Sequence, residues 1–249
     1  MESIFRRHEE KYLVTEEKSA ALRGMVAQHM APDRFGEYLV QNVYYDTDDW
    51  SVVRASIEKP LYKEKLRLRC YGTPRREGLA YLELKKKWKG TVYKRRVALP
   101  LAALSEGSLQ GLLSQDPSQI SHELAFYLAS HKVHGKAYIA YTRAAFTGAG
   151  DDGLRVTFDT DLRFRLDRLD FRCPGDGLPL LPQGTLLMEV KTEKGIPLWL
   201  AHGLSAGKVF PTRFSKYGTC YTDYILKQTR GDGDRKDGVG QCSTSLPVA

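Results

Sequence analysis

Residues 79–99 read LAYLELKKKWKGTVYKRRVAL, and this stretch decides the fold. Apolar and charged side chains alternate from Leu82 to Lys85, which is the period of a β-strand whose two faces meet different surroundings. Lys89 and Gly90 then form a turn signal, and the alternation resumes over residues 91–99. Adjacent strands joined by so short a turn are antiparallel, so the stretch predicts a hairpin within a meander.

The same alternation extends outward from this hairpin. Residues 62–71, YKEKLRLRCY, form the preceding strand and end at the turn signal Gly72-Thr73-Pro74. Further strands are expected at residues 5–14, 40–45, 136–146, 154–161 and 185–191, and helices at 16–30, 118–129, 197–203 and 215–227. Eight strands suffice to close a barrel around a small ligand. The predicted fold class is mainly β (α+β), an eight-stranded antiparallel β tunnel or barrel with flanking helices.

Length and composition are those of a folded chain. The 249 residues are 42% hydrophobic and 10% aromatic, which is too apolar for disorder and long enough for a proper core. Residues 1–229 are expected to form one domain, because no linker divides them. Residues 230–249 are Gly-rich and polar with almost no apolar anchors, which predicts a flexible C-terminal tail.

The sequence also predicts where the protein resides. No stretch approaches the roughly 18 apolar residues of a membrane span, and the N-terminus MESIFRRHEEKY is charged where a signal peptide has its apolar core. The four cysteines lie far apart without a C-x-x-C pair, which argues against a zinc site or a disulfide framework. We therefore expect a cytoplasmic protein without a membrane span.

The positive charge is concentrated in one segment. The chain has 38 Lys and Arg against 30 Asp and Glu, a formal net charge of +8. Residues 54–96 hold 15 of the basic residues and only 4 of the acidic ones, so the rest of the chain is slightly acidic. The strands in this segment therefore carry the charge that sets the chemistry.

Assigning residues to strand faces gathers the cations on one side. Arg67 and Arg69 alternate with Leu66 and Leu68, and the other strands repeat this pattern. The charged faces are expected to carry Arg7, Glu9, Lys11, Lys63, Lys65, Arg67, Arg69, Glu83, Lys85, Lys87, Lys94, Arg96, Tyr141, Arg143, Arg155, Asp159, Glu189 and Lys191.

Two interpretations fit this alternation. An ordinary antiparallel sheet has one solvated polar face. However, like charges on neighbouring strands cost stability unless an anion compensates, and the amphipathic helices offer partners for the apolar faces. If helices cover the outside, the cations face a lumen.

A lumen rich in Lys and Arg selects an anion of high charge density. Arg grips phosphate oxygens two at a time, and Lys adds point charges. A carboxylate among them, notably Glu189, is expected to bind a divalent metal that bridges phosphates. The faces thus predict a polyphosphate or nucleoside triphosphate ligand with a metal.

Seven short motifs in order resemble one known family. They are R-H-E-E-K-Y at 7–12, L-R-L-R at 66–69, E-L-K-K-K at 83–87, K-R-R at 94–96, Y-T-R at 141–143, M-E-V-K at 188–191 and S-K-Y at 215–217. Each alone is weak, but together they resemble the VTC domain, the polyphosphate polymerase module of the triphosphate tunnel metalloenzymes, in its free-standing bacterial form.

The resemblance implies an activity and a set of site residues. The domain is a metal-dependent phosphotransferase that moves the γ-phosphate of ATP onto a growing polyphosphate chain inside a basic tunnel. Its expected cofactor is Mn²⁺ or Mg²⁺, and its expected partners are ATP, pyrophosphate and polyphosphate, with no nucleic acid and no protein partner that the sequence identifies. The implied roles are catalytic for Arg67, Arg69, Lys85 and Arg143, phosphate-binding for Lys11, Lys94, Arg96, Tyr141, Ser215 and Lys216, and metal-binding for Glu189.

Two other functions stay open at this point. A triphosphatase or cyclase of the same superfamily would use the same lumen, because the strand faces do not distinguish hydrolysis from transfer. A binding module for nucleic acid or polyphosphate would need no metal carboxylate, and nucleic-acid binders usually interleave aromatic and basic residues on an open face. Tyr71 and Tyr81 are the only aromatic residues among the basic strands placed to stack on the charged face.

Overall fold

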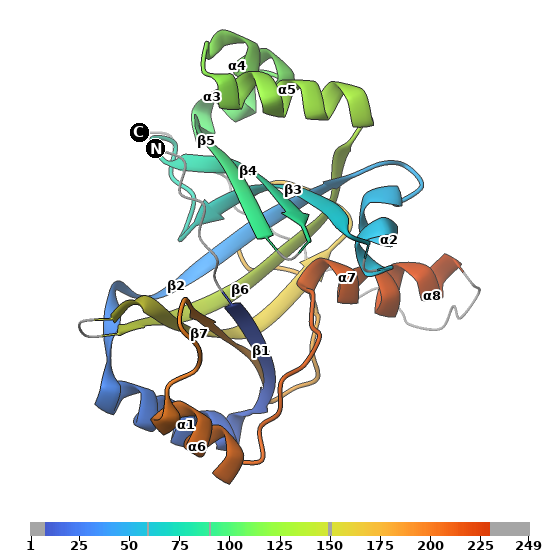
Figure 1. Cartoon of the computed structure of the whole chain (residues 1–249). Coiled ribbons are helices and arrows are strands. Elements are labelled where there is room, and N and C mark those ends of the chain that lie inside the picture. Colours follow the sequence, from blue (N-terminus) through green and yellow to red (C-terminus); the bar gives the residue numbers. More distant parts are fainter. Residues whose placement is uncertain (1–7, 59, 90, 149–150, 230–249) are drawn as a thin grey trace.

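The strands of the protein form one curled antiparallel sheet (Figure 1). The computed structural model describes residues 8–58, 60–89, 91–148 and 151–229. The expected tail at 230–249 lies outside the described residues. The strands are β1 His8–Thr15, β2 Met30–Asp46, β3 Tyr62–Tyr71, β4 Leu79–Trp88, β5 Thr91–Pro100, β6 His134–Gly148, β7 Asp151–Arg165, β8 Leu178–Pro179 and β9 Thr185–Thr192.

All eight predicted strands are present, and the fold class is confirmed. Their order across the sheet is β1-β9-β7-β6-β2-β3-β4-β5, and the two-residue β8 pairs with β7 as an unpredicted ninth strand. Among the described residues no ladder joins β1 to β5, so backbone hydrogen bonds leave the tunnel open along one seam.

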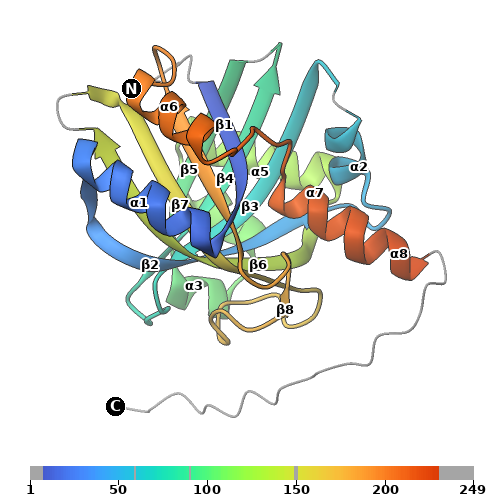
Figure 2. The ribbon, with the colours of Figure 1, turned by 90° about the horizontal axis from the view of Figure 1, so that it is seen from below.

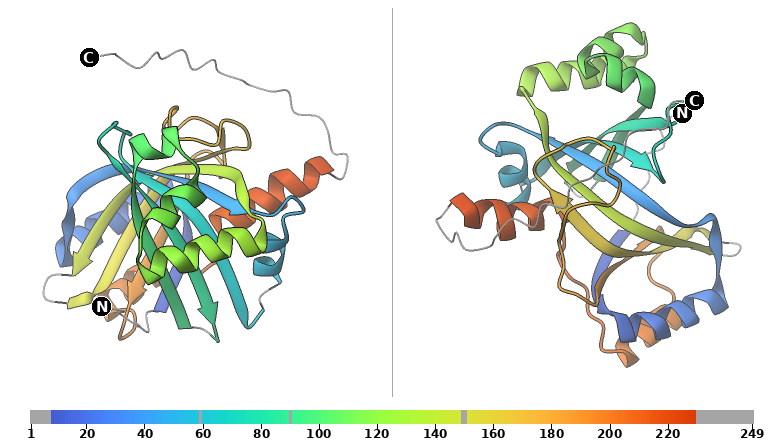
Figure 3. Two further views of the ribbon diagram at one scale, coloured as in Figure 1. Left: turned by 90° about the horizontal axis from the view of Figure 1, so that it is seen from above. Right: turned by 180° about the vertical axis from the view of Figure 1, so that it is seen from behind.

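Helices cover the outer face of this sheet in two groups. The first comprises α3 Leu101–Glu106, α4 Leu109–Gln115 and α5 Gln119–His131, which lie across β3, β4 and β5 (green in Figure 3, left). Leu66 and Leu82 from the strands meet Leu113 and Leu124 from the helices in one apolar cluster, and all four are fully buried. The apolar strand faces therefore turn outward against helices, as the alternation predicts.

The second group covers the other half of the sheet. Helices α1 Glu16–His29 and α6 Leu198–Ala206 lie side by side (Figure 2). Their Val26 and Leu200 pack on Val156 of β7 and Met188 of β9. Because both helix groups pack on the outer face, the charged side chains are left on the inner, concave face.

The C-terminal helical segment enters the concave face. It runs through α7 Lys216–Cys220, a π-helical turn Tyr221–Ile225 and α8 Leu226–Thr229, where the sequence predicts a single helix at 215–227. The Tyr217 ring stacks on Tyr44 of β2 with centroids 4.7 Å apart, within a cluster that includes Phe214 and Leu187. This apolar plug fills one end of the concavity and brings Ser215 and Lys216 into the lumen.

Several short elements are not foreseen by the sequence pattern. Helix α2 Ser51–Ile57 begins after Trp50, which has a φ of 62°, and its first amides are capped by a residue of the preceding strand: the Asp46 carboxylate accepts from Val52 N and Val53 N. The predicted caps are mixed: Ser118 accepts from Ser121 N, whereas Thr15 precedes α1 without a side-chain hydrogen bond.

Candidate active site

The strand register brings the predicted site residues level with one another on the concave face. Arg67 of β3 is directly opposite Glu83 of β4, which is opposite Arg96 of β5. One step along, Lys65 faces Lys85, which faces Lys94. On the other side of the lumen, Lys11 of β1 faces Glu189 of β9.

The first cluster surrounds Glu83, whose side chain is 1% exposed. Arg67 donates from Nε and Nη2 to Glu83 Oε2, at 2.9 and 2.8 Å. Lys94 Nζ lies 2.7 Å and Arg96 Nε 3.5 Å from Oε1, and Arg69 Nη1 lies 3.8 Å from Oε2. Burial alone raises the pKa of Glu83, but Arg67, Arg69 and Lys94 bring it well below its ordinary value. We call these five residues the Glu83 cluster.

The second cluster begins at Asp159 of β7, which is fully buried. Arg143 of β6 binds it with both ends of its guanidinium, Nε to Oδ1 at 2.6 Å and Nη2 to Oδ2 at 2.7 Å. Lys216 Nζ lies 2.6 Å from Oδ2. Burial lowers the pKa of Lys216, but Asp159 and Glu189 raise it above its ordinary value.

Glu189 completes this second cluster. Its Oε1 lies 3.2 Å from Lys216 Nζ and 3.9 Å from Lys11 Nζ, and its Oε2 lies 3.1 Å from Lys191 Nζ and 3.5 Å from Arg143 Nη2. Burial raises the pKa of Glu189, but Lys216, Lys191 and Lys11 hold it well below its ordinary value. The Asp159–Glu189 cluster comprises Asp159, Glu189, Lys11, Arg143, Lys191 and Lys216.

Glu9 links the edge strand β1 to the far wall of the lumen. It lies 3.6 Å from Lys85 of β4 and 3.5 Å from Lys11 of its own strand. Burial raises its pKa, but Lys85, Lys191 and Lys11 lower it to about 2. The sheet therefore curls far enough that side chains of β1 and β4 meet, although no backbone ladder closes the seam.

Lys65 and Tyr141 lie between the clusters. Lys65 Nζ donates to Ser215 Oγ at 2.9 Å, and burial together with Lys11, Lys63 and Lys85 lowers its pKa to about 7. The Tyr141 hydroxyl accepts from Arg69 Nη2 at 3.5 Å, and Lys216 Nζ lies 4.4 Å from the centre of its ring. The same Ser215 Oγ also caps α7 by accepting from Gly218 N.

The structure thus places all eleven sequence-predicted site residues in one lumen. Glu9 and Glu83 share it, as their strand positions indicate. Asp159, Lys65 and Lys191 also line it, although the sequence pattern puts them on the charged face without giving them a role. The only feature of the sequence that points to these residues is the strand alternation. Their partners become apparent only when strands distant in the sequence are paired.

The donor set fits a divalent cation that is shared with a phosphate ligand. Within the described residues no three His, Cys, Asp or Glu side chains are grouped to hold a metal by themselves. Mg²⁺ is typically bound by one or two carboxylates and substrate phosphates, and Glu189 and Glu9 face the same Lys11 ammonium. Thr157, directly opposite Glu189, has a buried hydroxyl oxygen without a hydrogen-bond partner. These are hard oxygen donors that suit such an ion.

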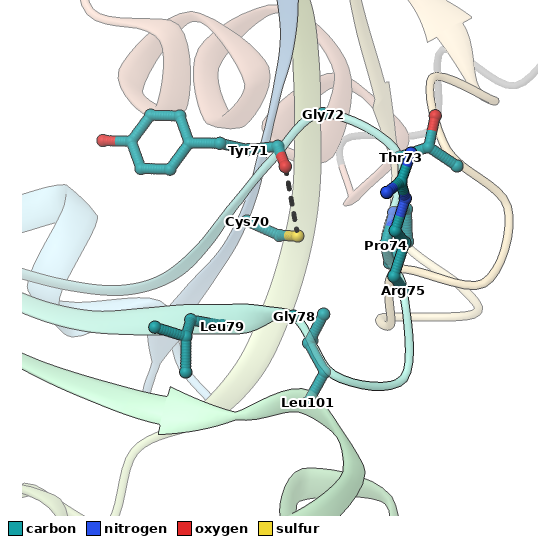
Figure 4. Close-up of a pocket in the computed structure, with 9 residues that line it drawn as sticks. All are labelled: Cys70, Tyr71, Gly72, Thr73, Pro74, Arg75, Gly78, Leu79 and Leu101. Atoms are coloured by element: carbon teal, nitrogen blue, oxygen red, sulfur yellow. Dashed lines mark hydrogen bonds between the residues drawn. The ribbon is translucent and has the colours of Figure 1, made fainter.

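A separate pocket lies at the turn between β3 and β4, outside the charged lumen (Figure 4). Its volume is about 400 Å³, and it is lined by Cys70, Tyr71, Gly72, Thr73, Pro74, Arg75, Gly78, Leu79 and Leu101. Only Arg75 among these is charged, and none belongs to either carboxylate cluster. The pocket therefore does not replace the lumen as the candidate site.

Comparison with known proteins identifies the family. Residues 6–224 match the VTC domain, so the chain belongs to the VTC domain family. No curated protein matches the chain. Within the described residues no helix is both long and apolar enough to cross a bilayer.

Two solved structures of low sequence similarity align with most of the chain. A candidate adenylate cyclase from Vibrio parahaemolyticus is 12% identical with a TM-score of 0.45, covering 88% of this chain and 100% of its own. The PH1819 protein from Pyrococcus horikoshii OT3 is also 12% identical with a TM-score of 0.45, covering 89% and 99%.

Proposed function

We propose that the protein is a polyphosphate polymerase that transfers the γ-phosphate of ATP to a growing polyphosphate chain. Its ligands would be ATP, pyrophosphate and polyphosphate, and Mn²⁺ or Mg²⁺ its cofactor. The observation that carries the proposal is the charge of the lumen. Among the residues that the structure describes, at least ten basic side chains line it against four carboxylates, an excess that an extended polyanion can neutralise. The ten are Lys11, Lys65, Arg67, Arg69, Lys85, Lys94, Arg96, Arg143, Lys191 and Lys216.

The accessibility of the cations supports a ligand that enters from solvent. Lys85 and Lys94 are each 45% exposed, and Arg96 is 38% exposed. Each of these side chains nevertheless lies on the concave face of the sheet, between neighbouring strands. A phosphate chain would therefore displace water from these groups while the buried carboxylates keep them aligned.

Phosphoryl transfer needs alignment and charge neutralisation more than covalent chemistry. The guanidiniums of Arg67 and Arg143 are held by carboxylates and that of Arg69 donates to the side-chain oxygen of Asn42, so their free donors are fixed in direction before the substrate arrives. Lys85 and Lys216 would add charge where it develops on the transferred group. The acceptor is a terminal phosphate oxygen that is already ionised near neutral pH, so no side-chain base has to remove a proton.

Glu189 would hold the divalent cation, with Glu9 and the Thr157 hydroxyl on the same wall. When bound, such an ion would neutralise charge that develops on the transferred group. Glu189 is suited to this because its low pKa keeps it ionised. Lys11 and Lys191, which contact Glu189 in the described structure, would then turn toward the phosphates.

The test is incubation with ATP and Mn²⁺ followed by gel electrophoresis for a polyphosphate ladder. We expect a ladder from the wild type, and none from Arg67→Ala or Glu189→Ala. Arg95→Ala is the matched control, because Arg95 neighbours Arg96 on β5 but contacts Glu123 on the outer face. Its ladder should be unchanged.

The products also separate the alternatives. Accumulation of only orthophosphate or pyrophosphate would identify a triphosphatase or cyclase of the same superfamily. Binding of tripolyphosphate without turnover would identify a binding module. Wild-type polymer from Arg67→Ala and Glu189→Ala would refute the assignment of the site.

A further inference from the structure

One end of the lumen carries a row of tyrosines that phosphate chemistry does not require. Tyr38 of β2, Tyr71 of β3 and Tyr81 of β4 alternate in register with the charged side chains and so lie on the same concave face. Their ring centroids are 6.1 Å apart from Tyr38 to Tyr71 and 5.8 Å apart from Tyr71 to Tyr81. We call these three residues the tyrosine rim.

Arginines of the Glu83 cluster lie against the tyrosine rim. The Arg96 guanidinium is centred 3.7 Å from the Tyr81 ring and 5.7 Å from the Tyr71 ring. Arg69 Nη1 donates to the Tyr71 hydroxyl at 3.4 Å. Tyr71 remains 38% exposed and Arg96 38% exposed, so planar groups that are already ordered face solvent at this mouth.

A flat aromatic surface interleaved with guanidiniums favours a flat, π-rich ligand. Bases stack on aromatic rings and on Arg planes, and each stacked base contributes about 1–3 kcal/mol. Inorganic polyphosphate has no such part, whereas a nucleotide donor does. In the described part of the chain the opposite end of the concavity offers no comparable surface, because the stacked Tyr44 and Tyr217 rings there belong to the buried plug.

We propose that the tyrosine rim, with Arg96, binds the base of the nucleotide that donates the phosphate. This inference rests on the proposed function, since it locates the nucleoside end of the same substrate. The phosphates would then run inward from Arg69 and Arg96 toward Arg67 and Lys94, the order in which these residues follow along β3 and β5. The inorganic acceptor would occupy the lysine-rich part beyond them.

The experiment compares the affinity of a non-hydrolysable ATP analogue with that of tripolyphosphate by titration calorimetry. Replacing both rings in Tyr71→Leu/Tyr81→Leu should weaken the analogue about tenfold, and leave tripolyphosphate affinity within twofold. Tyr71→Phe/Tyr81→Phe keeps the rings and removes the hydroxyls, so it should retain the analogue affinity. Tyr62→Leu is the matched control, because Tyr62 is 43% exposed on β3 but belongs to the outer face, where it contacts Trp88.

Three results would overturn the inference. They are an equal loss of both ligands in the Leu variant, the same loss in the Phe variant, and no binding of the ATP analogue by the wild type. Circular dichroism spectra that match the wild type show that each variant is folded, so a folding defect is not mistaken for loss of either ligand. If the Leu variant selectively loses the analogue but the wild type makes no polymer, the base site stands and the polymerase proposal fails.

Discussion

The two carboxylate clusters of the lumen differ in how completely their charges are paired. In the Glu83 cluster one carboxylate serves four cations, of which Lys94 and Arg96 are 45% and 38% exposed. In the Asp159–Glu189 cluster two carboxylates serve four cations, of which Arg143 and Lys216 are only 11% and 8% exposed. The first cluster exposes cations to solvent, whereas the second neutralises most of its charge through ion pairs within the cluster.

This difference indicates a structural role for one cluster and a ligand-binding role for the other. A buried ion pair stabilises a structure only when every partner is present, while exposed cations lose little when a partner is removed. The Asp159–Glu189 cluster therefore joins β1, β6, β7, β9 and α7 and fixes the carboxylate of Glu189, the proposed metal ligand. The Glu83 cluster, on the β3–β5 side beside the open seam, would be free to exchange its partners for phosphate oxygens in the proposed reaction.

The largest expected effect comes from removing Asp159. Asp159→Ala leaves Arg143 and Lys216 buried with only Glu189 between them, which should destabilise the protein by about 3–5 kcal/mol. Glu83→Ala should cost about half as much, because Lys94 and Arg96 can turn to water. Chemical denaturation of both variants measures the comparison, and a larger loss for Glu83→Ala would reverse our ranking of the clusters.

Replacing two lysines of the lumen should change stability by smaller amounts, in opposite directions for the two variants. Lys216→Met removes a cation whose pKa is raised by Asp159 and Glu189, so it should lower stability by about 1–3 kcal/mol. Lys94→Met removes a cation whose pKa is lowered, chiefly by burial, so the ligand-free protein should melt slightly higher. The Lys94 variant should also gain less from added tripolyphosphate, since ligand stabilisation follows affinity. Thermal melts with and without tripolyphosphate test this, and a fall in both ligand-free melting temperatures would contradict it.

Strand alternation alone predicts most of the fold. The bounds of β3 and β4 agree with the sequence at both ends, because neither strand contains a breaker and turn signals follow them at Gly72-Thr73-Pro74 and at Lys89-Gly90. β2 begins ten residues earlier than expected, at Met30, since Pro32 and Gly36 look like breakers and are instead absorbed by a register shift between Pro32 and Glu37. The short α2 depends on Asp46, a residue of the preceding strand, and such a cap has no local periodic signal.

The sequence predicts which residues line the candidate site, but not which of them contact one another. Alternation puts Arg67 and Glu83 on one face, and adjacent strands then make their contact almost inevitable. The contact of Arg143 and Asp159 with Lys216 depends instead on how α7 enters the lumen, which no periodicity records. For the same reason the sequence gives Glu189 a metal role without revealing that four cations already surround it. That role stays a prediction, as do the others.

The smallest expected effect concerns Lys65. It belongs to neither carboxylate cluster, and among the described ion pairs it has no carboxylate partner. The groups around it are Ser215 and the cations Lys11, Lys63, Arg67 and Lys85, and its pKa is lowered to about 7. Between pH 7 and the ordinary lysine pKa of 10.5 the unfolded chain binds this proton and the folded protein does not, so stability rises with pH there. From pH 6 to pH 8 the contribution is about 1 kcal/mol in favour of the higher pH. Lys65→Met should remove it, which denaturation of both proteins at the two pH values would detect. The same slope in both would mean that Lys65 stays charged in the folded protein and that another group pairs with it.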